Sequence, residues 1–127
     1  MLGSSNTVGF VPSIDLKRSR SFYEDILGLR FVKDDGFALI FEAGQRSVRI
    51  ANVCQVPDFK PLPFTVLGWE VKDVSKIAAG LNERGVKFEK YQWMEQDALG
   101  VWSSPTGDKV AWFKDPDGNI LSISQHA

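Results

Sequence analysis

The sequence predicts an α+β fold built from two copies of a strand–helix–strand–strand–strand module. The first observation is an internal repeat. An Asp that can cap a helix precedes a helical apolar pattern and a terminating Gly at residues 15–28 and again at 73–85, an offset of about 58 residues. The second observation is that candidate strands, separated by turn residues, follow each helix. Since one module is too small to bury both faces of its sheet, we expect two modules to keep their helices outside and curl their sheets around a shared interior.

The first module is predicted at residues 7–52. Its first strand is the apolar stretch 8–12, and Asp15 is expected to cap the helix that Gly28 ends. The apolar residues of this helix recur at near-helical spacing: Leu16, Phe22, Tyr23, Ile26 and Leu27. Three strands are expected after the helix, at residues 29–32, 37–41 and 47–51.

The second module is predicted at residues 64–125, after a linker at 53–63 that contains Pro57, Pro61 and Pro63. A first strand at 64–71 leads to Asp73, which is expected to cap a helix that Gly85 ends. Strands are then expected at residues 86–93, 109–113 and 120–124. Residues 99–103 are interpreted as an additional short strand or an ordered loop.

Composition narrows the classes of function. The chain has 127 residues and a net charge of −1, so it shows no electrostatic footprint for nucleic acid. Its apolar runs are too short to span a membrane. Cys54 is the only cysteine, which excludes an intrachain disulfide, and the N-terminal residues lack the pattern of a signal peptide. We therefore expect a cytoplasmic protein that binds neither nucleic acid nor membranes.

The segment from Trp112 to Ser122 is the most informative motif. Its turn, Asp115-Pro116-Asp117-Gly118, suits a tight hairpin. This hairpin resembles the closing hairpin of the vicinal oxygen chelate superfamily, the glyoxalase/bleomycin resistance protein/dioxygenase family. Residues 15–29 and 71–88 resemble its two helix motifs, so the match covers nearly the whole chain. The resemblance implies one such domain over residues 1–127, with a curved mixed sheet around a central cavity, and a homodimer.

The resemblance also locates the positions that hold a metal in the metalloenzymes of this family. Those enzymes typically use His, Glu or Gln at four strand positions. The matching positions here are Val8, Arg49, Val66 and Ser122. Hydrocarbon side chains cannot bind a metal, and an Arg is a permanent cation. Catalytic metals need anionic or imidazole donors, and the only histidine is His126, so we expect no metal and no cofactor.

Strand alternation indicates what the interior holds instead. If the same strand face points into the cavity here as in the family, Val8 and Val66 lie beside the residues expected to bind a ligand. Trp93 and Trp102 are then expected near the mouth of the cavity. The predicted ligand-binding residues are Arg49, Glu70, Ser122, Ser124, Phe10, Trp93 and Trp102. Two alternatives stay open. Arg49 and Glu70 form either a structural salt bridge or a polar anchor for a ligand. The tryptophans either pack in the core or an interface, or stack on a flat ligand.

The first functional hypothesis is a metal-independent small-molecule-binding protein of the glyoxalase/bleomycin-resistance type, whose partner is a small organic molecule. The alternative is a lyase, isomerase or dioxygenase of the same family with a non-standard or metal-free active site. In its metal-free form, Glu70 is the candidate catalytic base and Arg49 stabilises an oxyanion. A third reading is a structural or regulatory dimer with a collapsed cavity.

Overall fold

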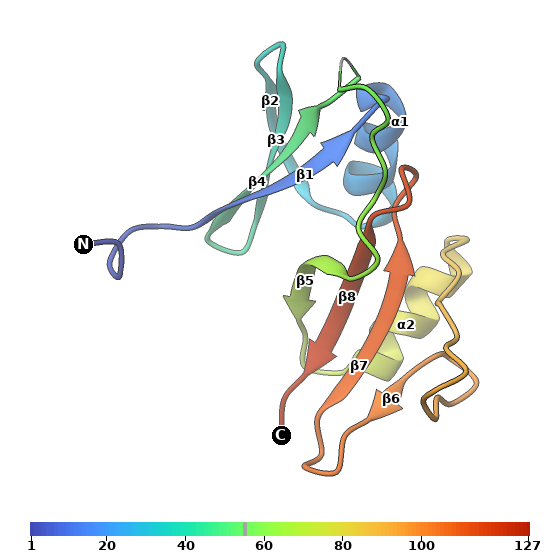
Figure 1. Cartoon of the computed structure of the whole chain (residues 1–127). Helices are drawn as coiled ribbons and strands as arrows, with labels where there is room; N and C mark the ends of the chain where they lie inside the picture. Colours follow the sequence, from blue (N-terminus) through green and yellow to red (C-terminus); the bar gives the residue numbers. More distant parts are fainter. Residues whose placement is uncertain (55) are drawn as a thin grey trace. The chain divides into compact units, whose positions relative to one another are not determined.

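The computed structural model describes residues 1–54 and 56–127. The chain divides into two compact units, Met1–Lys60 and Pro61–Ala127, called module 1 and module 2 below (Figure 1). The division falls inside the predicted linker, 53–63, of which Gln55 lies outside the described residues. Within the described residues, no helix combines the length and the apolar character that crossing a membrane requires.

Module 1 is a four-stranded mixed sheet with one helical segment. Strand β1 pairs parallel with β4, and the antiparallel pairs β4–β3 and β3–β2 complete the order β1-β4-β3-β2. The helical segment packs on β3 and β4. Its elements are β1 (Val8–Ser13), α1 (Leu16–Arg20), η1 (Ser21–Ile26), β2 (Arg30–Asp34), β3 (Ala38–Ala43) and β4 (Arg46–Asn52).

The predicted helix after Asp15 is confirmed, but its second half has π rather than α geometry. Asp15 caps it, since its Oδ1 accepts the Arg18 N–H at 3.1 Å. Further along, the Leu27 N–H donates to the Phe22 carbonyl, five residues back. This wider turn accompanies the burial of two adjacent large side chains, Phe22 and Tyr23, which an α-helical spacing would separate by about 100°.

Module 2 repeats this plan with the sheet order β5-β8-β7-β6, in which β5 and β8 are parallel. Asp73 caps α2 by accepting the Lys76 N–H at 3.1 Å, and α2 packs on β7 and β8. The elements are β5 (Thr65–Glu70), α2 (Val74–Glu83), β6 (Trp102–Ser103), β7 (Lys109–Lys114) and β8 (Ile120–Gln125). The α+β class and the two strand–helix–three-strand modules are thus confirmed, as two separate four-stranded sheets that do not close (Figure 1).

The predicted strand at 86–93 is wrong. The segment makes one isolated bridge to β7, between Phe88 and Phe113, and then leaves the sheet. The Gln96 side chain supplies the next hydrogen bonds in place of a ladder. It accepts the Tyr91 N–H at 2.7 Å and donates to the carbonyls of Glu89 and Gly100 at 2.9 and 2.8 Å. The short strand expected within 99–103 is confirmed as β6, which pairs with β7 further along.

The predicted turn of the closing hairpin is confirmed. One carboxylate oxygen of the buried Asp115 accepts the N–H groups of Asp117 and Asn119, each at 2.9 Å. The other accepts the Asn119 side-chain amide at 2.9 Å. Gly118 has a φ of 88°, which favours glycine. These bonds set the direction in which β8 returns along β7.

The close approach of β5 and β8 yields a test of the sheet register. A Cβ added to Gly68 would lie 2.6 Å from Ser122 Oγ and 3.3 Å from the Ser122 carbonyl oxygen. We expect Gly68→Ala to lower the free energy of unfolding by about 1 kcal/mol in urea denaturation, because overpacking is destabilising. Adding Ser122→Ala should restore most of that loss, because it removes the Oγ and keeps a Cβ that lies 3.8 Å from the added one. The control, Gly80→Ala on α2, meets no atom within 4 Å and should stabilise the protein. A neutral Gly68→Ala would contradict this register.

Candidate functional site

The sheet of module 2 has a face that α2 does not cover, called here the open face of module 2. Leu121 and Ile123 of β8 are buried, at 0% and 3% exposure, and belong to the side of the core. Alternation places Ser122 and Ser124 on the other side. The strand register adds their cross-strand partners to the open face: Gly68 and Glu70 from β5, and Trp112 and Val110 from β7.

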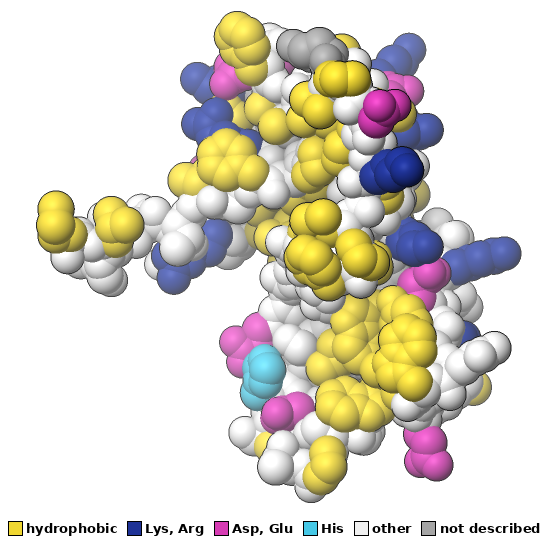
Figure 2. Space-filling model, viewed as in Figure 1, with side chains coloured by type: hydrophobic (Ala, Val, Ile, Leu, Met, Phe, Trp, Pro, Cys, Tyr) yellow, Lys and Arg dark blue, Asp and Glu magenta, His cyan; other side chains and the backbone are white. Residues whose placement is uncertain are grey.

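An aromatic pocket of about 230 Å³ opens beside this face. The Tyr91 ring centroid lies 4.7 Å from that of Trp93 and 5.8 Å from that of Trp112. Trp93 is 76% exposed, so its ring is available to a ligand. Figure 2 shows hydrophobic side chains gathered over module 2, in the lower half of the view. The pocket is lined by Pro63, Phe64, Thr65, Tyr91, Trp93, Met94, Trp112 and Ile120.

The loop of residues 89–101 positions two of these rings. Gln96 bridges its two ends, as described above. The Asp97 carboxylate adds a second fixed point, since its Oδ1 accepts the N–H groups of Leu99 and Val101, each at 2.9 Å. Burial raises the pKa of the Tyr91 phenol, and the charge of nearby Glu89 adds to this shift, while Lys114 opposes it. The hydrogen bond from the Tyr91 N–H to the Gln96 side chain therefore fixes where the loop presents this ring.

Several predicted site residues belong to this surface. Trp93 lines the aromatic pocket, and the Trp102 ring lies 6.4 Å from that of Trp112, centroid to centroid. Glu70 is exposed and is the cross-strand partner of Ser124, next to the pair of Gly68 and Ser122. The structure thus brings five of the seven predicted residues to module 2: Glu70, Trp93, Trp102, Ser122 and Ser124.

The other two predicted residues, Phe10 and Arg49, lie in module 1. They are cross-strand partners on β1 and β4, and Phe10 is 64% exposed. The Arg49 guanidinium forms an ion pair of 3.3 Å with Asp35 of its own module. The predicted pairing of Arg49 with Glu70, or of both with a ligand, stays a prediction.

Sequence reasoning missed a polar group next to Ser124. Ser124 Oγ lies 3.2 Å from His126 Nε2, and His126 Nδ1 lies 3.8 Å from Asp108 Oδ1. Because Ser124 and His126 are two residues apart at the end of β8, strand alternation could have indicated that they share a side. Asp108 joins them from the start of β7, which only the β7–β8 register reveals. The group adds a proton acceptor at the edge of the open face.

The residues at the family's metal positions do not fit a metal. Val8 and Val66 offer hydrocarbon, Arg49 is a cation paired with Asp35, and Ser122 offers one hydroxyl. Among residues 1–54 and 56–127, no group of three or more His, Cys, Asp or Glu side chains could hold a metal ion.

Comparisons with known proteins agree with this architecture. A model of the Glyoxalase/Bleomycin resistance protein/Dioxygenase superfamily matches residues 7–123. The chain is 28% identical over 121 residues to "Uncharacterized protein YraH" of Bacillus subtilis (strain 168). This match covers 86% of this chain and 88% of that protein.

Two solved structures share the fold. TnmS3, an antibiotic binding protein from Streptomyces sp. CB03234, has a TM-score of 0.75 at 24% identity, covering 100% of this chain and 99% of that one. Lactoylglutathione lyase from Agrobacterium tumefaciens has a TM-score of 0.73 at 19% identity, and the match covers 96% of this chain and 93% of that one. At these identities the likeness shows the fold alone.

Asp35, the partner of Arg49, yields a prediction about pH. The N–H groups of Phe37 and Ala38 are the largest cause that lowers the pKa of this carboxyl, and the charge of Arg49 contributes less. The pKa of the Asp35 carboxyl is lower in the folded protein than in the unfolded chain. Its carboxylate therefore stabilises the fold at pH values above the unfolded-state pKa, and this stabilisation is lost as the pH falls through the folded-state pKa. We expect Arg49→Met to leave most of the lowering in place in a ¹³C NMR titration of the carboxyl, and Asp35→Asn to weaken the acid dependence of unfolding. A return of the pKa to its usual value in Arg49→Met would contradict this order of causes.

Proposed function

We propose that this chain, which belongs to the Glyoxalase/Bleomycin resistance protein/Dioxygenase superfamily, is a metal-independent small-molecule-binding protein. The observation that carries the proposal is the aromatic pocket of module 2, where Tyr91, Trp93 and Trp112 meet in a concave site of about 230 Å³. Concave, largely apolar sites with a few polar groups are typical of small-molecule binding. TnmS3, an antibiotic binding protein with the same fold, supports a binding role for this chain.

The pocket favours a flat, uncharged portion of an organic ligand. Its described lining residues carry no charge, so burying a charged group there would be costly. Aromatic rings prefer offset or edge-to-face partners, and the Tyr91–Trp93 pair presents an exposed ring for such stacking. Polar parts of the same ligand would reach Glu70, Ser122 and Ser124 on the open face. Trp102, Phe10 and Arg49 are proposed as further contacts.

Metal independence rests on the chemistry of the four family positions, which lack the imidazole and carboxylate donors a catalytic metal needs. We propose in addition that the chain forms a homodimer in the cytoplasm and binds no nucleic acid. Support for the dimer comes from large exposed apolar side chains outside the aromatic pocket, including Ile14, Val32 and Val56. An interior lined by both modules, as the family resemblance implies, stays a prediction.

A metal-free enzyme is the second candidate. The observation that favours it is the location of Glu70 next to Ser124, which itself lies 3.2 Å from His126, on one uncovered surface. Two proton acceptors on the face of the sheet that also carries the aromatic pocket could serve acid–base chemistry, with Glu70 as the base. In that case Glu70→Gln would abolish turnover of the bound ligand and spare its binding.

Native mass spectrometry of protein purified without chelators tests the metal and the dimer. We expect the mass of a metal-free homodimer, with any co-purified organic ligand as an added mass. No metal is expected because Val8, Arg49, Val66 and Ser122 together offer only one neutral hydroxyl and no imidazole or carboxylate. A stoichiometric divalent metal would overturn the metal-independent proposal. A monomer at micromolar concentration would overturn the dimer.

Binding of the uncharged fluorescent probe N-phenyl-1-naphthylamine tests the aromatic pocket. We expect saturable binding to the wild-type chain and a roughly fivefold larger dissociation constant for Trp93→Ala, because stacking on one aromatic ring contributes about 1 kcal/mol. The matched control is Phe37→Ala, which removes an exposed aromatic ring (80%) from module 1. Equal weakening by both variants would show that the probe reports exposed rings in general, and the pocket assignment would fall.

A further inference from the structure

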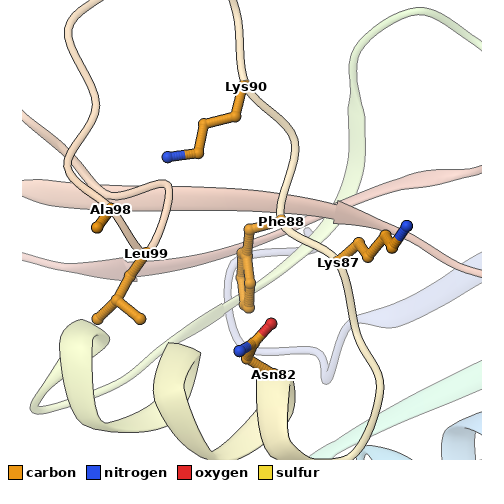
Figure 3. A pocket seen from close by; sticks show the side chains of 6 residues that line it. All are labelled: Asn82, Lys87, Phe88, Lys90, Ala98 and Leu99. Carbon is orange, nitrogen blue, oxygen red and sulfur yellow. The ribbon is translucent and has the colours of Figure 1, made fainter.

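We propose that module 2 carries a second binding site, on the helix side of its sheet, that takes a small organic carboxylate. A cavity of about 210 Å³ lies between the end of α2 and the 89–101 loop (Figure 3). It is called the lysine pocket here and shares no lining residue with the aromatic pocket. Its lining residues are Asn82, Lys87, Phe88, Lys90, Ala98 and Leu99.

The lysine pocket is formed by the end of α2 and by the segment that bridges to β7. Phe88 makes the isolated bridge to the buried Phe113, which belongs to the side of the sheet that α2 covers. Asn82 comes from the last turn of α2. Figure 3 shows the Phe88 ring at the centre, between Leu99 on one side and Lys87 on the other, with Asn82 below it. The site is thus separate from the open face and from the residues of the proposed function.

The charge of the pocket is positive. Among the described residues, Lys87 and Lys90 form no ion pair with a carboxylate. Lys90 Nζ donates to the Asp97 carbonyl at 2.6 Å, which leaves two of its three N–H donors for a ligand. The Asn82 amide adds further donors. Together these groups can bind an anion with charge-assisted hydrogen bonds.

Two negative groups of the elements that form the pocket are engaged in hydrogen bonds. The Asp97 carboxylate accepts the N–H groups of Leu99 and Val101 inside its own loop. The Leu81 carbonyl at the end of α2 accepts the N–H groups of Arg84 and Val86, each at 3.0 Å. The helix end therefore presents less unpaired negative character to a bound anion than a free C-terminus would.

The apolar walls determine what accompanies the anionic group. The ring of Phe88 and the side chain of Leu99 flank the cavity, as Figure 3 shows, so a ring or a branched hydrocarbon fits between them. The volume suits one ring with a short substituent. A carboxylate matches the remaining donors of Lys90. The predicted ligand class is an aryl or short branched carboxylate.

Benzoate is the probe for this site, followed by ¹H–¹⁵N NMR of the full chain. We expect saturable shifts of the amides at residues 82, 87–90 and 98–100, with roughly fivefold weaker binding for Lys90→Met, which keeps the aliphatic length and removes the charge. The matched control, Lys76→Met, removes an exposed lysine near the start of α2 and should leave benzoate binding unchanged. Benzamide, which lacks the charge, and acetate, which lacks the ring, should each bind more weakly than benzoate.

Three outcomes would overturn the proposal. They are no saturable shift at these amides, equal binding of benzoate and benzamide, and equal weakening by Lys90→Met and Lys76→Met. The N-phenyl-1-naphthylamine titration separates this proposal from the previous one. Trp93→Ala should weaken binding of that probe and leave benzoate binding unchanged, because Trp93 lines the aromatic pocket and not the lysine pocket.

Discussion

Each module has one helical segment for a four-stranded sheet. The helical segment can cover only one face of that sheet, and this limit determines which strand residues remain accessible. In module 1 both faces of β3 are nevertheless buried, since its four residues from Ala38 to Phe41 are all buried. In module 2 the buried side includes Phe113 and Leu121, both fully buried, and the opposite side presents Glu70, Ser122 and Ser124. The candidate ligand-binding surface is therefore a direct consequence of the fold's layer arrangement.

The 89–101 loop is the feature that distinguishes module 2 from a plain repeat of module 1. Where a strand would have used backbone hydrogen bonds, Gln96 satisfies three backbone groups with one side chain. The loop can then leave the sheet edge while those backbone groups keep their hydrogen bonds. It contributes Tyr91, Trp93 and Met94 to one pocket and Lys90, Ala98 and Leu99 to the other. Two cavities of opposite character thus depend on the same segment.

The four positions that hold a metal in the metalloenzymes of the family carry no imidazole or carboxylate in this chain. Valines at two family positions make those parts of the surface apolar, and Arg49 forms an ion pair with Asp35 instead of facing a metal. The Asp35 carboxylate is in turn held by the N–H groups of Phe37 and Ala38. Binding energy at such a surface has to come from aromatic stacking and hydrogen bonds, which suits recognition of an organic molecule.

Local signals in the sequence determined the caps at Asp15 and Asp73, the closing hairpin and the order of elements, because capping, turn formation and periodicity act over a few residues. The same alternation placed Glu70, Ser122 and Ser124 on one side of a sheet. The tertiary structure decided what depends on residues far apart in the chain. Residues 86–93 have strand-like composition, but Gln96 and the bridge to Phe113 determine their path. The approach of Asp108 to His126 and the pocket walls follow from strand register and loop conformation, which no short stretch of sequence encodes.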